Sequence, residues 1–294
     1  MHICICVCTY KRNRLLKKLL LKLARQETAG EFTYSVVVAE NDREQLAKAV
    51  VDEIASSSPI PIRHCVEPRQ NIAMARNKAV TNAYGDFIAF IDDDEFPSDD
   101  WLLTAFRTCI KYNAEGVLGP VRPFFEHQPP VWVVKGRFWE LPDHPTGYRL
   151  RWREASTSNV LLRRRVLDGI EGPFRHEFGS GGEDHDFFKR LMERGAVFLW
   201  CNEAIVHELV PPERWRRRYL LQRALQRGQA AKELTDLFEA RKSLLAIPLY
   251  ALMAPFLLLA GQHRFMRCMV SLCDHVGMLL GRFGYTPMGD KYLS

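Results

Sequence analysis

The sequence predicts an α/β fold in which helices cover both faces of a doubly wound parallel sheet. Apolar segments alternate with amphipathic segments through the first 120 or so residues, and this order is typical of parallel, right-handed strand–helix–strand units. A hydrophobic content of 47% and a charged content of 26% are those of a globular protein, and 294 residues are enough for one large domain and an appendage.

The expected elements follow one another in order. Continuous apolar runs indicate buried parallel strands, here at 2–9, 34–39, 62–66, 87–91 and 116–121. Between them, apolar residues recur with helical spacing, as in the leucines at 15, 16, 19, 20 and 23. The helices are expected at 14–25, 43–54, 72–83 and 101–112.

The strand at 87–91 ends in three aspartates, Asp92, Asp93 and Asp94. Ligands of open α/β sheets bind at the carboxyl ends of the strands. Adjacent carboxylates repel unless a cation lies between them, and hard oxygen ligands suit Mg²⁺ or Mn²⁺ bound together with phosphates. The motif therefore indicates a metal–diphosphate site. For Asp99 and Asp100, which follow it, we favour helix-capping or a solvated loop instead.

Polar residues also follow the other strands and should gather at the same edge of the sheet. These are the segments 9–12, 40–42 and 69–71, with Arg76 one turn into the next helix. None contains GxGxxG or a Walker sequence, so the two common nucleotide-binding loops are unsupported. The set can still hold a nucleotide diphosphate. We interpret Lys11, Arg12 and Arg14 as a solvated helix start.

Charge and cysteine usage narrow the class of protein. The net charge of +6 is modest, and no nucleic-acid partner is predicted. No signal peptide is expected, because the first ten residues read as a strand. The eight cysteines include no CxxC pair. Cys4, Cys6 and Cys8 alternate along one strand, which favours reduced core residues over disulfides or a zinc site.

The second half contains an irregular segment, 122–158, rich in proline and aromatic residues. Trp132, Trp139 and Trp152 either line an acceptor groove or pack the segment onto the sheet. The segment 156–159 before an expected strand at 160–162 either lines that groove or supplies strand-entry hydrogen bonds. A helix is expected to begin at Glu183-Asp184 and end near Gly195. Acids in its first turn can simply stabilise the helix.

The C-terminal segments suggest membrane association. Residues 214–227 predict a basic amphipathic helix suited to an anionic membrane surface. Residues 244–260 are uncharged and 265–280 largely apolar, and we interpret the pair as a membrane-embedded hairpin that does not clearly span twice. Flanking Arg and Lys residues indicate a cytoplasmic face. A helical lid or an oligomer interface is the alternative.

Five motifs together resemble family 2 glycosyltransferases of the GT-A fold, in particular bacterial exopolysaccharide (succinoglycan-type) glucosyltransferases. They are Cys8-Thr-Tyr-Lys-Arg12, Val38-Ala-Glu-Asn41, Asn71-Ile-Ala-Met-Ala-Arg-Asn77, Gly85-Asp-Phe-Ile-Ala-Phe-Ile-Asp-Asp-Asp94 and Gly182-Glu-Asp-His-Asp-Phe187. The resemblance implies a doubly wound mixed, mainly parallel sheet with helices on both faces, followed by a helical, membrane-associated region. It places a catalytic domain at 1–210, with a nucleotide-sugar half (1–121) and an acceptor half (122–210), and a tail at 211–294.

The resemblance also implies roles for single residues. The donor is a nucleotide-diphosphate sugar, with UDP favoured, and the cofactor is Mn²⁺ or Mg²⁺. The nucleotide-sugar residues are Thr9 and Glu40 around the base, with Tyr10 beside them, Arg76 on the phosphates, and Asp92 and Asp93 near the ribose and diphosphate.

For the metal and the chemistry, the resemblance points to four further residues. Asp94 would bind the metal, and His207, expected just after a strand at 204–206, would complete the metal site or touch the diphosphate. Asp184 would be the base of an inverting transfer, with Glu183 beside it.

Two functions remain open at this point. The first is an enzyme that adds a sugar to a saccharide or lipid-linked saccharide at the cytoplasmic face of the plasma membrane. The second is a non-catalytic, sugar-nucleotide-binding or partner-binding subunit of the same fold in a polysaccharide assembly complex. The presence of the aspartate motif together with Asp184 favours the enzyme. A nucleotidyltransferase is disfavoured, because a glycine-rich N-terminal phosphate loop is missing.

Overall fold

The structure is a computed structural model that describes residues 1–140, 142–179, 181–231 and 237–285, without the side chains of 237–240. The chain forms two compact units. The first contains Met1–Arg122, Leu141–Gly179 and Glu183–Glu208, and the second contains Pro123–Glu140, Ser180–Gly182 and Leu209–Ser294. Residues 232–236 and 286–294 of the expected tail lie outside the described residues.

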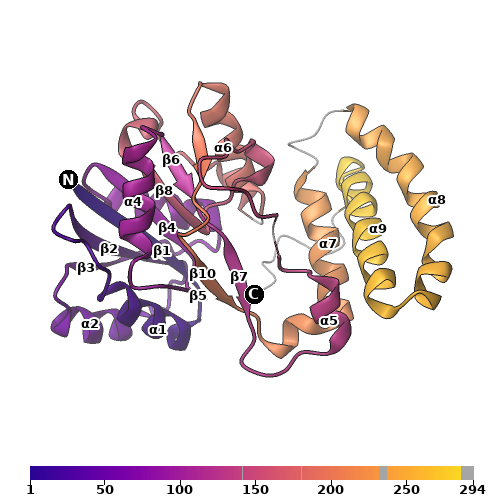
Figure 1. Cartoon of the computed structure of the whole chain (residues 1–294), viewed down its shortest axis with the longest axis horizontal. Coiled ribbons are helices and arrows are strands. Elements are labelled where there is room, and N and C mark those ends of the chain that lie inside the picture. Colours follow the sequence, from indigo (N-terminus) through magenta and orange to yellow (C-terminus); the bar gives the residue numbers. More distant parts are fainter. Residues whose placement is uncertain (141, 180, 232–236, 286–294) are drawn as a thin grey trace. The chain divides into compact units, whose positions relative to one another are not determined.

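A seven-stranded sheet forms the centre of the first unit (Figure 1). Its order is β3-β2-β1-β4-β8-β6-β9, and its strands are β1 (His2–Thr9), β2 (Thr33–Glu40), β3 (Ile62–Val66), β4 (Phe87–Ile91), β6 (Gly116–Leu118), β8 (Asn159–Arg163) and β9 (Phe198–Trp200). The first four strands are parallel to one another, and β8 runs antiparallel to β4 and β6. The mixed, mainly parallel sheet expected from the resemblance is confirmed.

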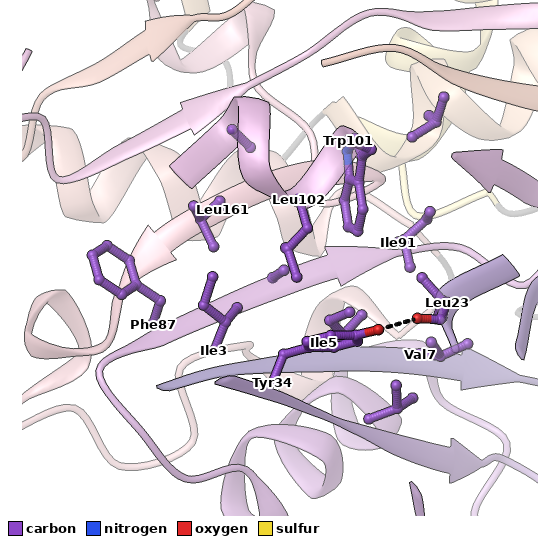
Figure 2. Close-up of a cluster of buried hydrophobic side chains, with 14 of the residues drawn as sticks. Ile3, Ile5, Val7, Leu23, Tyr34, Phe87, Ile91, Trp101, Leu102 and Leu161 are labelled. Carbon is purple, nitrogen blue, oxygen red and sulfur yellow. Dashed lines mark hydrogen bonds between the residues drawn. The ribbon is translucent and has the colours of Figure 1, made fainter. Parts of the chain in front are cut away.

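Helices cover both faces of this sheet, and each face has its own core. On one face, Ile3, Ile5 and Val7 of β1 pack with α1 (Asn13–Leu23), α2 (Lys48–Ser57) and α4 (Trp101–Lys111) (Figure 2). On the other face, Cys4 and Cys6 pack with α3 (Ile72–Asn82) and α6 (Glu183–Glu193). Strand alternation explains this division. Cys4 and Cys6 are buried, whereas Cys8 is only partly buried, so the expected core position is confirmed for the first two.

The second helix begins later than the sequence suggests. We expected it from residue 43, but α2 starts at Lys48. The preceding residues form a turn, because the Asp42 side chain accepts from the Glu44 N–H at 3.2 Å and Gln45 has a φ of 53°. Glu40 Oε1 then accepts from the Ala47 N–H at 2.7 Å, at the N-terminus of α2.

The strand expected at 116–121 is two strands in different sheets. β6 ends at Leu118, and β7 (Val121–Phe124) joins β5 (Glu95–Pro97) and β10 (Val206–Leu209) in a sheet of order β5-β10-β7. Gly119 allows the chain to change direction there, since a Cβ on it would lie 2.0 Å from the Ala204 carbonyl oxygen. The strand expected at 204–206 lies at 206–209, so His207 is inside a strand rather than after it.

Asn159, at the start of β8, ties these segments together. Its Oδ1 accepts from the Trp101 indole N–H at 2.8 Å, and its Nδ2 donates to the carbonyls of Pro120 and Ala204 at 3.1 and 2.8 Å. Of the two interpretations of the segment 156–159, Asn159 therefore fits the strand-entry one.

We expect Asn159→Ala to lower the free energy of unfolding by about 2–4 kcal/mol, because it leaves buried polar groups unpaired. The neighbouring Thr157 is a matched control. Its hydroxyl is buried and has no hydrogen-bond partner among the described residues, so Thr157→Val should be nearly neutral. Urea unfolding of both variants measures this, and equal losses would contradict the role of Asn159.

The second unit is mainly helical. It contains α5 (Val131–Gly136), α7 (Arg217–Ala231), α8 (Leu237–Leu259) and α9 (Gln262–Arg282), with α9 packed against the other three. Its small core includes Val133, Trp139 and Met266. Trp139 is 8% exposed, so its side chain is buried, but it packs in this helical core and not onto the sheet. Trp132 packs partly buried against the same core.

The described residues also form short 3₁₀ turns, namely η1 (Trp152–Glu154), η2 (Arg164–Leu167), η3 (His176–Phe178) and η4 (Pro212–Trp215).

The apolar C-terminal segments differ in character. Among the described residues, one helical stretch, Arg241–Leu259, is long and apolar enough to cross a membrane by length and composition. It belongs to α8. The segment 265–280 lies in α9, which does not meet the same criterion. This agrees with the expectation that the two segments do not clearly span the membrane twice, and the membrane-embedded hairpin itself stays a prediction. The basic helix expected at 214–227 begins at Arg217, after the turn η4.

Candidate functional site

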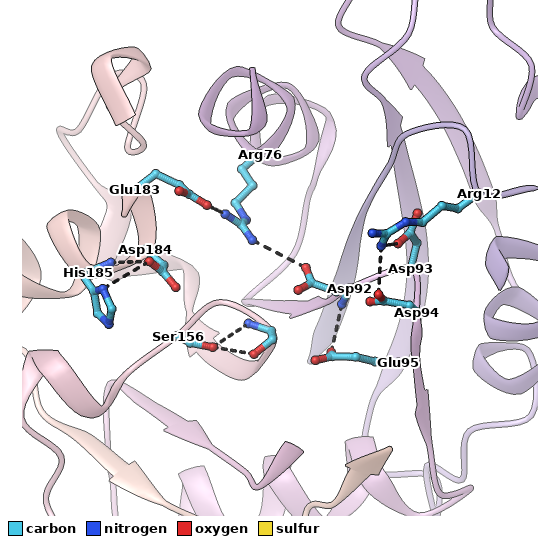
Figure 3. A network of polar contacts seen from close by, with 11 residues as sticks. Arg12, Arg76, Asp92, Asp93, Asp94, Glu95, Ser156, Glu183, Asp184 and His185 are labelled. Carbon is cyan, nitrogen blue, oxygen red and sulfur yellow. Dashed lines mark hydrogen bonds and ion pairs between the residues drawn. The ribbon is translucent and has the colours of Figure 1, made fainter. Parts of the chain in front are cut away.

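Three aspartates stand at the carboxyl end of β4, as the sequence indicated (Figure 3). Their side chains differ in environment: Asp92 is 41% exposed, Asp93 5% and Asp94 9%. Asp93 accepts from the Thr9 hydroxyl at 2.7 Å, which joins the ends of β1 and β4. Burial raises the pKa of Asp93 to about 6, and the nearby guanidinium of Arg12 opposes the rise.

Arg12 connects two of these aspartates. Its Nη1 lies 2.9 Å from Asp93 Oδ1 and 2.9 Å from Asp94 Oδ2, so one cation neutralises both carboxylates. The interpretation of Arg12 as a solvated residue is therefore wrong. Its position follows from the strand order, because Arg12 comes directly after β1, and β1 is the neighbour of β4.

Glu95 shapes the turn behind the aspartates. Its Oε2 accepts from the Asp92 N–H at 3.0 Å. The side chain is buried, and this burial raises its pKa well above the ordinary value for a glutamate. Glu95 thus holds the turn in place, while Asp92 keeps its carboxylate exposed.

Arg76 joins the aspartates to the second half of the unit. It lies on α3, whose first turn is capped by Asn71 accepting from the Met74 N–H at 3.0 Å. The Arg76 guanidinium lies 3.6 Å from Asp92 Oδ1 and donates a hydrogen bond to Glu183 at the start of α6 (Figure 3). Segments about 90 residues apart thereby meet in one site.

The first turn of α6 carries three acids with different partners. Asp184 is 23% exposed and accepts from the His185 N–H at 2.7 Å. Asp186 instead pairs with Arg190 at 2.8 Å and Arg175 at 3.5 Å. The second carboxylate oxygen of Glu183 is buried and has no hydrogen-bond partner among the described residues. Asp184 is thus the most accessible of the three carboxylates, since the side chains of Glu183 and Asp186 are 5% and 6% exposed.

The chain before α6 is bound to α3 by hydrogen bonds. Asn77 exchanges two of them with the backbone of Phe174, at 2.6 and 2.9 Å, and Asn71 Nδ2 donates to the His176 carbonyl at 2.8 Å. A Cβ on Gly179 would lie 2.0 Å from the Asn71 side chain, so a glycine is needed at this contact. These contacts place the start of α6 beside Arg76.

The remaining candidate residues lie around this centre. Both carboxylate oxygens of Glu40 are engaged, one by the Ala47 N–H and the other by His64 Nε2 at 2.8 Å. Tyr10 is partly exposed, with the Lys11 ammonium 5.4 Å from its ring centroid. His207 is exposed on β10 and pairs with Phe96, two residues beyond Asp94. The structure thus links Thr9, Arg76, the aspartates and Glu183 through direct contacts. Glu40 instead contacts Ala47 and His64.

The oxygen donors present fit a divalent cation that also binds phosphates. Among the described residues, no group of three or more His, Cys, Asp or Glu side chains is arranged to hold a metal by itself. Mg²⁺ commonly uses only one or two protein carboxylates and completes its shell with phosphates and water. Asp94, next to the exposed Asp92, supplies one carboxylate of this kind.

Comparison with protein families gives a match over most of the first unit. The family model described as glycosyl transferase family 2 matches residues 4–170. A similar protein is the succinoglycan biosynthesis protein ExoM of Rhizobium meliloti, which is 37% identical over 236 residues, 78% of this chain and 74% of its own.

Two solved structures share the fold. A mannosyltransferase from Pyrobaculum calidifontis, in complex with GDP-Man and Mn²⁺, superimposes with a TM-score of 0.67 at 18% identity, over 97% of this chain and 88% of its own. TarS of S. aureus, in complex with UDP, gives a TM-score of 0.55 at 16% identity, over 98% of this chain and 93% of its own. At these identities the likeness concerns the fold.

Proposed function

The chain belongs to glycosyltransferase family 2, and we propose that it moves a sugar, with inversion at the anomeric carbon, from a nucleotide-diphosphate sugar to a saccharide or lipid-linked saccharide. Its likeness to a succinoglycan biosynthesis protein supports a place in bacterial exopolysaccharide synthesis. UDP is the nucleotide that we favour.

The contact of Arg76 with both Asp92 and Glu183 is the observation on which this proposal rests. It joins the aspartates at the sheet edge, which suit a diphosphate, to the acids of α6, which suit an acceptor. Transfer between two substrates requires both groups in one place. A purely structural acidic cluster would not need an exposed carboxylate on each side of the arginine, as Asp92 and Asp184 provide.

In the transfer step, Asp184 acts as the general base. An acceptor hydroxyl oxygen forms a bond to the anomeric carbon while its proton passes to the Asp184 carboxylate. The bond from that carbon to the diphosphate oxygen breaks, and the nucleoside diphosphate leaves with the electron pair. The unpartnered Glu183 oxygen offers an acceptor for a sugar hydroxyl.

On the donor side, Asp92 and Asp93 are proposed to face the ribose and diphosphate, with Arg76 supplying positive charge. Thr9, Tyr10 and Glu40 are proposed to surround the base. Asp94, with His207 on the neighbouring strand, is the proposed protein share of a Mn²⁺ or Mg²⁺ site. Such a cation supplies charge stabilisation for the leaving diphosphate when it is bound.

Arg12 should compete with that cation for the aspartates. We expect Arg12→Ala to lower the free energy of unfolding of the metal-free protein by about 1–3 kcal/mol, since removing one partner exposes the remaining carboxylates to mutual repulsion. We also expect it to tighten Mn²⁺ binding. Thermal unfolding with and without Mn²⁺, and Mn²⁺ titration followed by electron paramagnetic resonance, measure the two effects.

Arg14 is the matched control for Arg12. It is exposed in the first turn of α1, two residues after Arg12, so Arg14→Ala should leave both stability and Mn²⁺ binding nearly unchanged. Equal behaviour of the two variants would show that Arg12 has no special relation to the aspartates.

A panel of labelled nucleotide sugars tests the function as a whole. Each donor is incubated with the protein and with lipid extracts of the source membrane, in the presence of Mn²⁺, Mg²⁺ or a chelator. We expect one donor to give a metal-dependent, lipid-linked product. Saturable nucleotide binding without transfer or hydrolysis would favour a binding subunit instead.

Association with the cytoplasmic face of the plasma membrane completes the proposal. The apolar stretch Arg241–Leu259 supports it, and a lipid-linked acceptor would be available there.

A further inference from the structure

The outer surface of α8 is apolar over an unusually wide angle. Only Ser243 and Ala254 are buried in the described part of the helix, whereas Leu245 is 77% and Leu259 88% exposed. The exposed large apolar side chains of this helix are Leu244, Leu245, Leu249, Leu252, Met253, Phe256, Leu258 and Leu259. At about 100° per residue they spread over about 220° of its circumference.

That width argues against a second helix as the occupant. In a coiled coil, a partner helix covers only the narrow stripe formed by heptad positions a and d. Even a helix that faces a protein core needs an apolar arc of only about 100° or somewhat more. The outer surface of α8 is twice that wide. Hydrocarbon, which surrounds a helix from many directions, fits it better.

The inner side of α8 is bound to α9 in an antiparallel hairpin. Ser243 Oγ lies 2.9 Å from His275 Nδ1, and the Cys268 thiol donates to the Tyr250 carbonyl at 3.3 Å. Residues early in α8 therefore meet residues late in α9. Because the two helices pack along their lengths, α8 cannot enter a bilayer end-on without taking α9 with it.

The helix α7 is fixed to the opposite side of α9. Arg227 forms two hydrogen bonds to Asp274, at 2.9 and 2.7 Å. A Cβ on Gly228 would lie 2.1 Å from the Asp274 carbonyl oxygen, and one on Gly277 would lie 2.2 Å from the Leu225 carbonyl oxygen. Backbones this close make α7 and α9 one rigid pair.

The end of this helical group at the α8–α9 turn is strongly basic. Arg217 and Arg218 are exposed at the start of α7, and Arg264 and Arg267 at the start of α9. Arg217 Nε lies 3.1 Å from the side-chain oxygen of Gln262, with that amide oriented to accept, so the two starts lie together. If α8 crossed the membrane, one end of this helical group would have to pass through the hydrocarbon core. The opposite end also carries charge, because Arg241 and Lys242 are exposed near the start of α8, so either passage is costly.

Charge is also divided unequally along the chain. Residues 209–294 contain 13 Lys and Arg against 6 Asp and Glu, a net charge of +7, whereas residues 1–208 carry 28 against 29, a net charge of −1. The positive charge of the whole protein thus lies in the part that contains α7, α8 and α9. Basic residues beside an apolar helix attract anionic lipid headgroups.

We propose that α8 lies in the plane of an anionic membrane, within one leaflet, with its outer surface in the hydrocarbon and the basic ends of α7, α8 and α9 in the headgroup layer. This inference rests on the membrane location in the proposed function and deepens it. It makes the protein monotopic, with both ends of α8 on the same side of the bilayer.

Vesicle flotation tests the lipid contact. The full-length protein should float with phosphatidylglycerol-containing vesicles and much less with pure phosphatidylcholine. The triple variant Leu245→Lys, Leu252→Lys, Phe256→Lys should bind at least about tenfold more weakly. A control triple on exposed positions of the first unit, Leu21→Lys, Leu46→Lys, Ile110→Lys, should bind as the wild type does. Equal flotation of the two triple variants would overturn the proposal.

Side-specific thiol labelling tests the orientation. Arg241→Cys and Ala260→Cys place a thiol at exposed positions near the two ends of α8. In sealed membrane vesicles, an impermeant maleimide should label both from the same side, above the labelling of the unsubstituted protein. Labelling of Ala260→Cys only from the opposite side would mean that α8 spans the bilayer, and the proposal would be wrong.

Further measurements distinguish the proposed membrane contact from a dimer interface and from the proposed sugar transfer. If the wild type is a dimer that the triple lysine variant dissociates, and neither binds vesicles, the outer surface is an interface between two copies and the proposal fails. Nucleotide binding by the triple lysine variant should match the wild type. Vesicle binding without any sugar transfer would reject the proposed enzyme but leave the membrane contact intact, and transfer without vesicle binding would do the reverse.

Discussion

Asp184→Asn should abolish sugar transfer while leaving nucleotide and metal binding intact. Asparagine keeps the size of the side chain and can still accept from the His185 N–H, which Asp184 does at 2.7 Å. It cannot accept the proton of an attacking hydroxyl, and a general base contributes about 10²–10⁴ to the rate. Transfer of labelled sugar and calorimetric titration with UDP, on the same preparation, measure the two properties.

Asp186→Asn provides the matched control. This residue lies two positions further along α6, but its carboxylate is paired with Arg190 and Arg175. Its substitution should lower stability and leave the transfer rate of the folded enzyme within a few-fold of the wild type. If Asp184→Asn transferred sugar at the wild-type rate, the assignment of the base would be wrong.

Asp94→Ala should weaken nucleotide affinity only when a divalent cation is present. The proposed cation uses Asp94 as a ligand, and loss of a group that supports a metal typically costs about 10–100-fold in metal affinity. Without the cation, the nucleotide has no indirect contact with Asp94 to lose. UDP titrations in Mn²⁺ and in chelator measure the difference.

Asp99→Ala is the control for charge alone. Asp99 is 54% exposed and lies 3.7 Å from Lys22, outside the aspartate cluster, so its removal should change neither titration. An equal loss of affinity with and without Mn²⁺ in Asp94→Ala would instead assign Asp94 to direct nucleotide contact or to folding. A folding defect in Asp94→Ala is not expected, because Arg12 keeps its ion pair with Asp93.

The errors in the expected elements have specific structural causes. The period of apolar residues located β1, β2 and β4 within a residue or so, because buried parallel strands are continuously apolar. It placed the start of α2 five residues too early, because the turn at Asp42–Gln45 depends on a side-chain hydrogen bond and a left-handed residue. It merged β6 with β7, because the change of sheet at Gly119 depends on how closely Ala204 approaches.

Arg12 and Glu40 show what residue type alone does not reveal. A basic residue at a helix start is usually solvated, and nothing near Arg12 in the chain distinguishes it from the exposed Arg14. Its pairing with Asp93 and Asp94 arises from the adjacency of β1 and β4. Glu40 has the position expected for a base contact, yet it also caps α2 and pairs with His64; its predicted nucleotide role remains to be tested.

The sequence by itself determined the α/β class, the delivery of three aspartates to the sheet edge, and the basic and apolar character of the C-terminal part, because each follows from local periodicity or composition. Only the tertiary structure decided that Arg76 joins Asp92 to Glu183, that Arg12 bridges two aspartates, and that the described part of α8 exposes a wide apolar surface while most side chains of α9 are half-buried. Such contacts depend on which elements become neighbours, and residues about 80–110 positions apart carry no local pattern that records their meeting.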